Sequence, residues 1–174
     1  CINGTHALQM CLKVCGVSRD DEVIVPTLTF VAPINAVCYN NANPIFMDSD
    51  NNYNIDQSKT ISFIKEKTVY RNGKTINRKT KKVIKAIIIV HVFGNAANID
   101  DLVNICRKRN IKIIEDASES LGTIYKHKKV HTGTIGDLGV ISFNGNKIIT
   151  SGGGGMIITN NDELNERIRY LIFQ

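Results

Sequence analysis

The sequence predicts an α/β domain in which a mostly parallel sheet is sandwiched by helices. Helical and strand-like patterns alternate along the 174 residues, and this alternation is typical of a parallel sheet with crossover helices. The run at residues 87–90, Ile-Ile-Ile-Val, is apolar at every position, as a strand buried on both faces requires. A chain of this length with 43% hydrophobic residues fits one globular domain.

The first half of the chain supplies three helices and two strands to this prediction. A helix is expected over residues 5–15, because Asn3 suits its start and Gly16 its end. A second helix is expected over residues 30–39, where Pro33 falls in the first turn and its missing N–H does no harm. The remaining elements of this half are strands at residues 22–25 and 44–47 and a helix at residues 57–65.

The second half continues the alternation. Residues 83–90 are expected to form a long apolar strand, and residues 99–109 a helix whose Leu102, Val103 and Cys106 share one face. Further strands are expected at residues 111–114, 139–143 and 156–159, and another helical pattern runs from residue 164 to residue 173.

Basic side chains are concentrated in one segment, residues 65–85, which holds nine lysines and arginines and accounts for much of the net charge of +6. Asn72 and Gly73 in its middle predict a tight hairpin turn. Nucleic-acid binding would call for interleaved aromatic residues, and Tyr70 is the one aromatic there. We therefore expect a solvated surface hairpin without a nucleic-acid function.

Membrane and metal sites are not predicted. No apolar run approaches the roughly 20 residues of a membrane span, and no signal peptide is visible, so a cytoplasmic protein is expected. The five cysteines form no C-x-x-C pair, and the histidines lack metal-ligand spacing. Buried reduced thiols are therefore a better interpretation of the cysteines than metal ligands.

Lys147 and its surroundings predict a pyridoxal phosphate (PLP) site. Lys147 follows a strand that carries Ser142, and Asp116 stands at the mouth of an earlier strand. In PLP chemistry a lysine forms a Schiff base with the aldehyde, and an aspartate keeps the pyridine nitrogen protonated. Hydroxyls and backbone N–H groups, such as those where a helix begins at Gly4, hold the phosphate.

Two other interpretations of this region are a flexible linker and a Walker-type phosphate loop. The glycine run at residues 152–155 could be a flexible linker, but its apolar flanks favour a close approach of two backbones. A phosphate loop of the Walker type requires Gly-Lys followed by Ser or Thr. Here Asn146 separates Gly145 from Lys147 and Ile148 follows, so that interpretation fails.

Several motifs stand in the same order as in a known family: Asn3-Gly4-Thr5-His6-Ala7-Leu8, Asp21-Glu22-Val23-Ile24-Val25-Pro26, Thr27-Leu28-Thr29-Phe30, Ala42-Asn43-Pro44, His91-Val92-Phe93-Gly94, Glu115-Asp116-Ala117 and Ser142-Phe143 ahead of Lys147. In these the chain resembles the DegT/StrS-type sugar-nucleotide aminotransferases, PLP enzymes of the aspartate aminotransferase fold (fold type I). Residues 119–122 and 143–147 look most like the legionaminic-acid-type branch.

The resemblance implies a role for each candidate residue. Lys147 and Asp116 would be catalytic, and Phe30 would stack on the cofactor ring. Glu119 would lie near the PLP hydroxyl and the substrate. The cofactor phosphate would be held by Gly4, Thr5, His6 and Ser142. Simpler roles remain open: core packing for Phe30, a helix cap or turn for Asp116, and a purely structural role for His91.

The resemblance also implies the reaction and the partners. The branch transfers an amino group from L-glutamate to C4 of a UDP- or GDP-linked 4-keto-6-deoxy-N-acetylhexosamine, as a homodimer with its active site at the interface, in bacterial surface-sugar biosynthesis. Residues 1–174 would form most of the PLP-binding large domain, with an N-terminal arm and a C-terminal small domain outside them. Two alternatives are a family dehydratase, in which histidine usually replaces the lysine, and a non-catalytic nucleotide-binding module.

Overall fold

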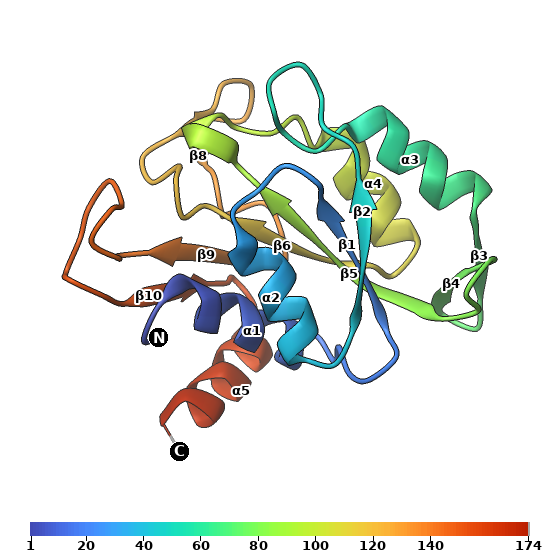
Figure 1. The fold of residues 1–174 in the computed structure, drawn as a ribbon, viewed down its shortest axis with the longest axis horizontal. Helices are drawn as coiled ribbons and strands as arrows, with labels where there is room; N and C mark the ends of the chain where they lie inside the picture. The colour runs from blue at the N-terminus through green and yellow to red at the C-terminus, as the bar shows by residue number, and fades with distance from the viewer. Residues whose placement is uncertain (174) are drawn as a thin grey trace.

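A computed structural model describes residues 1–173 and shows one eight-stranded sheet with helices on both faces (Figure 1). The main path of the sheet runs β10 (Gly155–Ile158), β9 (Leu138–Ser142), β6 (Lys112–Asp116), β5 (Val83–Val90), β1 (Glu22–Pro26) and β2 (Asn43–Met47). Every neighbouring pair from β9 to β2 is parallel, and β10 is antiparallel to β9. The expected mostly parallel sheet is thus confirmed.

The helices cover the two faces of this sheet in two groups. On one face, α1 (Gly4–Val14), α2 (Val31–Tyr39) and α5 (Asp162–Phe173) share a core cluster with the sheet. On the other face, α3 (Gln57–Glu66) and α4 (Asp100–Lys108) share a second cluster. Strand β5 contributes side chains to both core clusters, because Ile88 and Val90 belong to the first cluster and Ile87 and Ile89 to the second. Helices cover both faces of the sheet because β5 carries apolar side chains on both faces.

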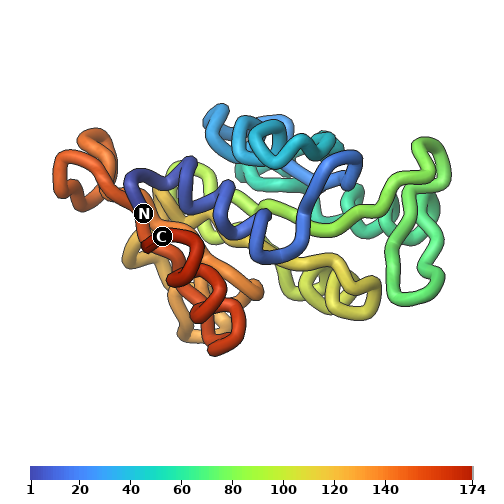
Figure 2. The backbone as a smooth tube through the Cα atoms, turned by 90° about the horizontal axis from the view of Figure 1, so that it is seen from below, coloured from blue at the N-terminus to red at the C-terminus, as the bar shows by residue number. Residues whose placement is uncertain are grey.

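The basic segment forms the expected hairpin, made of β3 (Thr68–Arg71) and β4 (Lys74–Asn77). Asn72 and Gly73 have φ values of 51° and 72°, the left-handed pair that a tight hairpin turn needs. Strand β4 pairs with the start of β5, so the hairpin extends the sheet. Figures 1 and 2 both place it at the opposite end of the molecule from the loop at residues 143–154. Its lack of a nucleic-acid function stays a prediction.

Some boundaries differ from the sequence-based expectations. Strand β6 continues through Asp116, because pairing with β5 and β9 on both sides extends it. The short strands β7 (Ile124–Tyr125) and β8 (Val130–His131) and the 3-10 turn η1 (Val92–Gly94) were not predicted, since two or three residues show no period.

Within residues 1–173, no helix has the length and apolar character needed to cross a membrane. In the same residues, no three His, Cys, Asp or Glu side chains gather as metal ligands would. The expectation of buried thiols holds for Cys11 and Cys106, and burial raises the pKa of Cys106 to about 12. It was wrong for Cys38, which is exposed on α2.

Candidate active site

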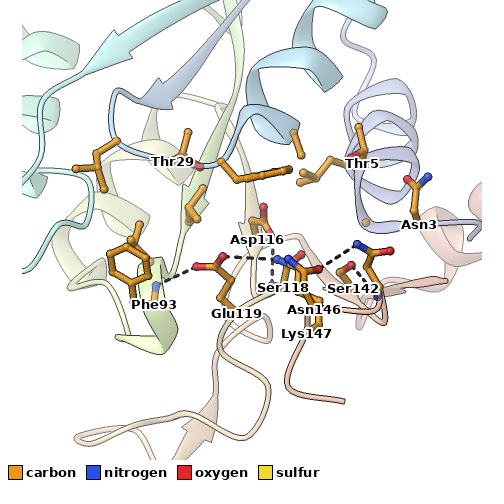
Figure 3. Close-up of a pocket in the computed structure, with 18 of the residues that line it drawn as sticks. Asn3, Thr5, Thr29, Phe93, Asp116, Ser118, Glu119, Ser142, Asn146 and Lys147 are labelled. Carbon is orange, nitrogen blue, oxygen red and sulfur yellow. Dashed lines mark hydrogen bonds and ion pairs between the residues drawn. The ribbon is translucent and has the colours of Figure 1, made fainter. Parts of the chain in front are cut away.

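A cavity of about 580 Å³ lies where the parallel strands end (Figure 3). Strands β5, β6 and β9 end beside it at Val90, Asp116 and Ser142, and the segment after β1 adds Thr29. The first residues of α1 form another wall. Ligands collect at this edge in open α/β sheets, because side chains and loops converge there.

The start of α1 forms an anion cradle together with two hydroxyls. The Asn3 side chain caps the helix by accepting a hydrogen bond from the His6 backbone N–H at 2.8 Å. A Cβ at Gly4 would lie 3.0 Å from the Ser142 Cβ and 3.3 Å from the hydroxyl oxygens of Ser118 and Ser142. Glycine therefore lets the helix terminus approach both hydroxyls, and the N–H groups at a helix start suit an anion.

The glycine run positions this helix start. A Cβ at Gly155 would lie 2.5 Å from the Asn3 carbonyl oxygen, a distance that no side chain tolerates. Gly154 and Gly155 donate backbone hydrogen bonds to Ile2 and Cys1 at 3.0 and 2.8 Å. The run is therefore a close backbone approach, as its apolar flanks indicated, and it joins β10 to the start of α1.

Asp116 is buried at the base of the cavity. One of its carboxylate oxygens accepts a hydrogen bond from the Ser118 N–H at 3.0 Å. Burial raises the pKa of Asp116, while hydrogen bonds from Ser118 and the charge of Lys147 act in the opposite direction. A buried carboxylate of this kind is stabilised by a cationic partner, such as a protonated ring nitrogen.

Lys147 enters the cavity from the loop after β9 and faces an acidic side chain. Its Nζ lies 3.6 Å from Glu119 Oε1, and the other oxygen of Glu119 accepts a hydrogen bond from the Phe93 N–H at 3.1 Å. The same Nζ lies 5.9 Å from the centre of the Phe30 ring. Phe30 is 67% exposed at the cavity, so it is not a core residue; stacking on the cofactor stays a prediction.

Glu115, next to Asp116, anchors the loops behind the cavity, a role that no local pattern in the sequence indicated. The carboxylate accepts hydrogen bonds from the Tyr125 hydroxyl at 2.8 Å and from the backbone N–H groups of Gly133, Ile135 and Gly136. Burial tends to raise the pKa of Glu115, but hydrogen bonds from His91, Gly136 and Gly133 outweigh it and hold this pKa below its ordinary value.

His91 is a structural residue. Its ring is fully buried and does not line the cavity. Its Nδ1 accepts a hydrogen bond from the Ala97 N–H at 3.1 Å, so Nε2 carries the proton and donates to Glu115 at 3.0 Å. These contacts favour the purely structural role that the sequence left open for His91.

The structure brings together most of the predicted site residues. The cavity is lined by Gly4, Thr5, Phe30, Asp116, Glu119, Ser142 and Lys147. His6 is not among the lining residues, and its backbone N–H donates to the Asn3 side chain, so its contact with the cofactor phosphate stays a prediction. The hydroxyl of Ser118, two residues beyond Asp116, was missed although its place after a strand was a usable signal.

A mostly parallel sheet whose strand ends combine a lysine, a buried aspartate and an anion cradle defines a PLP-binding domain. The model of the DegT/DnrJ/EryC1/StrS aminotransferase family matches residues 1–174, and the chain belongs to this family. The resemblance to this family is thereby confirmed, and with it the fold class; the likeness to the legionaminic-acid-type branch stays a prediction.

Individual relatives agree with this assignment. The chain is 44% identical to the GDP-perosamine synthase of Escherichia coli O157:H7 over 95% of its own length and 41% of that protein. A crystal structure of a family aminotransferase from Brucella abortus superposes with a TM-score of 0.87 at 34% identity, over 99% of this chain and 44% of that one. NtdA of Bacillus subtilis, solved with bound cofactor PMP, has a TM-score of 0.76 at 28% identity over 96% of this chain and 34% of that one.

PLP is the cofactor of this family, and the residues present fit it. The space that a Cβ at Gly4 would fill, between two serine hydroxyls and a helix start, suits the phosphate. Buried Asp116 suits the ring nitrogen, and Lys147 lies at the same cavity. The chain spans about two fifths of the length of the curated relatives it matches.

Proposed function

We propose that the protein containing this chain is a PLP-dependent sugar-nucleotide aminotransferase. It takes the amino group of L-glutamate and transfers it to C4 of a UDP- or GDP-linked 4-keto-6-deoxy sugar, an N-acetylhexosamine in the branch that the chain resembles, for bacterial surface sugars. The observation that carries the proposal is the convergence of Lys147, Asp116 and the Gly4–Ser142 cradle on one cavity.

Each residue has a defined task in this reaction. The bound cofactor supplies an aldehyde that accepts the amino group and a ring that withdraws electrons. Asp116 holds the proton at the ring nitrogen, and the cradle of Gly4, Thr5 and Ser142 binds the phosphate. Lys147 moves one proton away from the α-carbon of the donor and, in the second half-reaction, returns one to the sugar carbon.

The two alternative functions are less well supported. Lys147 occupies the position that holds histidine in the dehydratase branch, and its Nζ lies at the cavity where a proton shuttle needs it. A non-catalytic nucleotide-binding module would not require a buried aspartate opposite a lysine. Purified protein of that kind would also lack the absorbance near 400 nm that bound PLP produces.

The decisive test is chemical trapping in the whole protein. Borohydride reduction followed by peptide mapping is expected to place the pyridoxyl mass on Lys147, and Lys147→Ala is expected to lower turnover by on the order of 10²–10⁴. The matched control is Lys74→Ala in β4, which should change neither result. A pyridoxyl mass on another lysine would contradict the assignment.

The assembly and location belong to the same proposal. We expect a cytoplasmic homodimer in which residues 1–174 form most of the large domain and the partner chain completes the active site. Size-exclusion chromatography with light scattering and a glutamate-dependent amination assay of the 174-residue segment beside the whole protein test this. A monomeric segment that aminates the sugar at the full rate would refute it.

A further inference from the structure

Two exposed aromatic side chains, Tyr53 and Phe93, line the cavity at the end opposite the anion cradle. They are 55% and 74% exposed, and their rings meet edge to face with centres 6.3 Å apart. Figure 3 shows Phe93 beside Glu119, with Asn3 and Ser142 at the far side. Contiguous apolar groups that stay exposed at a cavity mark a candidate binding surface.

Both residues are held in a backbone conformation that costs energy. The φ values are 67° at Tyr53 and 53° at Phe93, in the left-handed region that residues other than glycine rarely adopt. Strain of this kind, on the order of 1–3 kcal/mol per residue, persists where the surrounding structure enforces it and is concentrated at functional sites. Two strained aromatic residues in contact at one cavity therefore indicate a built surface.

A buried side chain locks the two aromatic segments together. Asn54 is 1% exposed; its Oδ1 accepts a hydrogen bond from the Val92 N–H at 3.0 Å, and its Nδ2 donates to the Asn95 carbonyl at 3.4 Å. Asp50 closes the first loop by accepting from the Asn54 N–H at 3.0 Å. The Tyr53–Phe93 wall is thus preorganised, which lowers the entropy cost of binding a ligand against it.

The Glu119 carboxylate connects the Tyr53–Phe93 wall to the amine of Lys147. The Phe93 N–H binds one oxygen of Glu119, and the other oxygen lies 3.6 Å from Lys147 Nζ. With its phosphate in the cradle and its ring at Asp116, the cofactor would leave the part of the cavity lined by Tyr53 and Phe93 open to a substrate that reacts at Lys147. In the proposed acceptor the reacting C4 belongs to the sugar ring itself, whose nonpolar C–H face and 6-methyl group suit an aromatic surface.

We propose that Tyr53 and Phe93 form the subsite for the 6-deoxy sugar ring of the acceptor. The proposal rests on the function proposed above and deepens it, since it assigns a specificity surface to the second half-reaction alone. L-Glutamate carries two carboxylates and has no apolar ring face, so it gains little from this wall.

The test uses the whole protein and measures the two half-reactions separately. Phe93→Ala and Tyr53→Ala are expected to weaken binding of the nucleotide-linked amino sugar product about tenfold, as truncation of a stacked aromatic group does. Isothermal titration calorimetry measures that binding. The glutamate half-reaction, followed by cofactor absorbance in single-turnover mixing, is expected to stay within about twofold.

Three variants serve as controls. Tyr53→Phe and Phe93→Tyr keep an aromatic face and should retain most of the sugar affinity. Tyr70→Ala removes an exposed aromatic group from β3, in the distant hairpin, and should change nothing. Phe93→Ala keeps the backbone N–H that binds Glu119, so Lys147 should remain oriented.

Three outcomes would overturn the inference. Unchanged affinity for the amino sugar in both alanine variants would show that Tyr53 and Phe93 do not contact the sugar. Equal losses in the glutamate and sugar half-reactions would show that the two residues have only a structural role. An equal loss of affinity for the free nucleoside diphosphate would place the base there instead of the sugar. If the wild-type protein accepts the amino group from glutamate but aminates no nucleotide sugar, the proposed function itself fails. If the wild-type protein aminates the sugar and the alanine variants bind it unchanged, only the subsite fails.

Discussion

Lys147 Nζ and Glu119 Oε1 lie 3.6 Å apart, and the second oxygen of Glu119 is fixed by the Phe93 N–H. The resemblance placed Glu119 near the cofactor hydroxyl, and the structure adds a contact with the amine that we propose for proton transfer. Glu119 can therefore orient Lys147 whenever the amine is not bonded to the cofactor.

We predict that Glu119→Gln slows transamination by roughly two- to fivefold, because a partly exposed ion pair is worth up to about 1 kcal/mol. The amide oxygen of glutamine can still accept the Phe93 hydrogen bond, so the loop should keep its shape. Glu119→Ala loses both contacts and should be slower than Glu119→Gln in single-turnover assays. Equal rates for wild type and both variants would show that the ion pair does not contribute.

Asp116→Asn is expected to keep the fold and lose most of the activity, because a neutral amide cannot hold a proton on the ring nitrogen. Turnover with glutamate and the cofactor spectrum measure this effect. Near-wild-type turnover would exclude the role assigned to Asp116.

The same substitution has a second expected effect on the cofactor-free protein. Burial raises the pKa of Asp116 in the folded protein above the ordinary pKa of an aspartate. The folded state therefore loses stability as the pH rises from the ordinary pKa through the folded pKa, because the buried group then ionises. Above the folded pKa, Asp116→Asn should therefore raise the thermal unfolding temperature of the cofactor-free protein. A lower unfolding temperature would contradict this account.

Gly4→Ala tests the anion cradle. The added Cβ would lie 3.0 Å from the Ser142 Cβ, and overpacking of this kind costs about 1–3 kcal/mol. We expect PLP affinity to fall roughly 5- to 150-fold, measured by titrating the apoprotein with PLP. Gly145→Ala is the matched control, since a Cβ there meets nothing within 4 Å.

Glu115→Gln is expected to destabilise the protein by on the order of 3 kcal/mol, because an amide cannot accept all the hydrogen bonds that converge on the carboxylate. The pKa of Glu115 lies below its ordinary value of 4.5, so its contribution is fully present above that pH and is lost as the pH falls through the folded pKa. Denaturant unfolding at pH 7 and at pH 3 should show a smaller difference between wild type and variant at pH 3.

The sequence alone determined the layers of this protein and the residues of its candidate site. Apolar runs such as residues 87–90 require burial on both faces, and a strand of that kind has to lie inside a sheet covered by helices. Lys147, Asp116, Ser142 and Gly4 were predictable because they follow or begin elements whose ends meet at one edge of a parallel sheet.

The tertiary structure decided the contacts between segments that are distant in the chain. Glu115 is a charged residue that follows apolar residues in its strand. Its hydrogen-bond partners Ile135 and Gly136 come from a loop some 20 residues later. The ion pair of Glu119 with Lys147 and the meeting of Tyr53 with Phe93 depend on how loops cross at the cavity. No local period encodes such contacts, because they arise from packing of whole elements and not from the spacing of neighbouring residues.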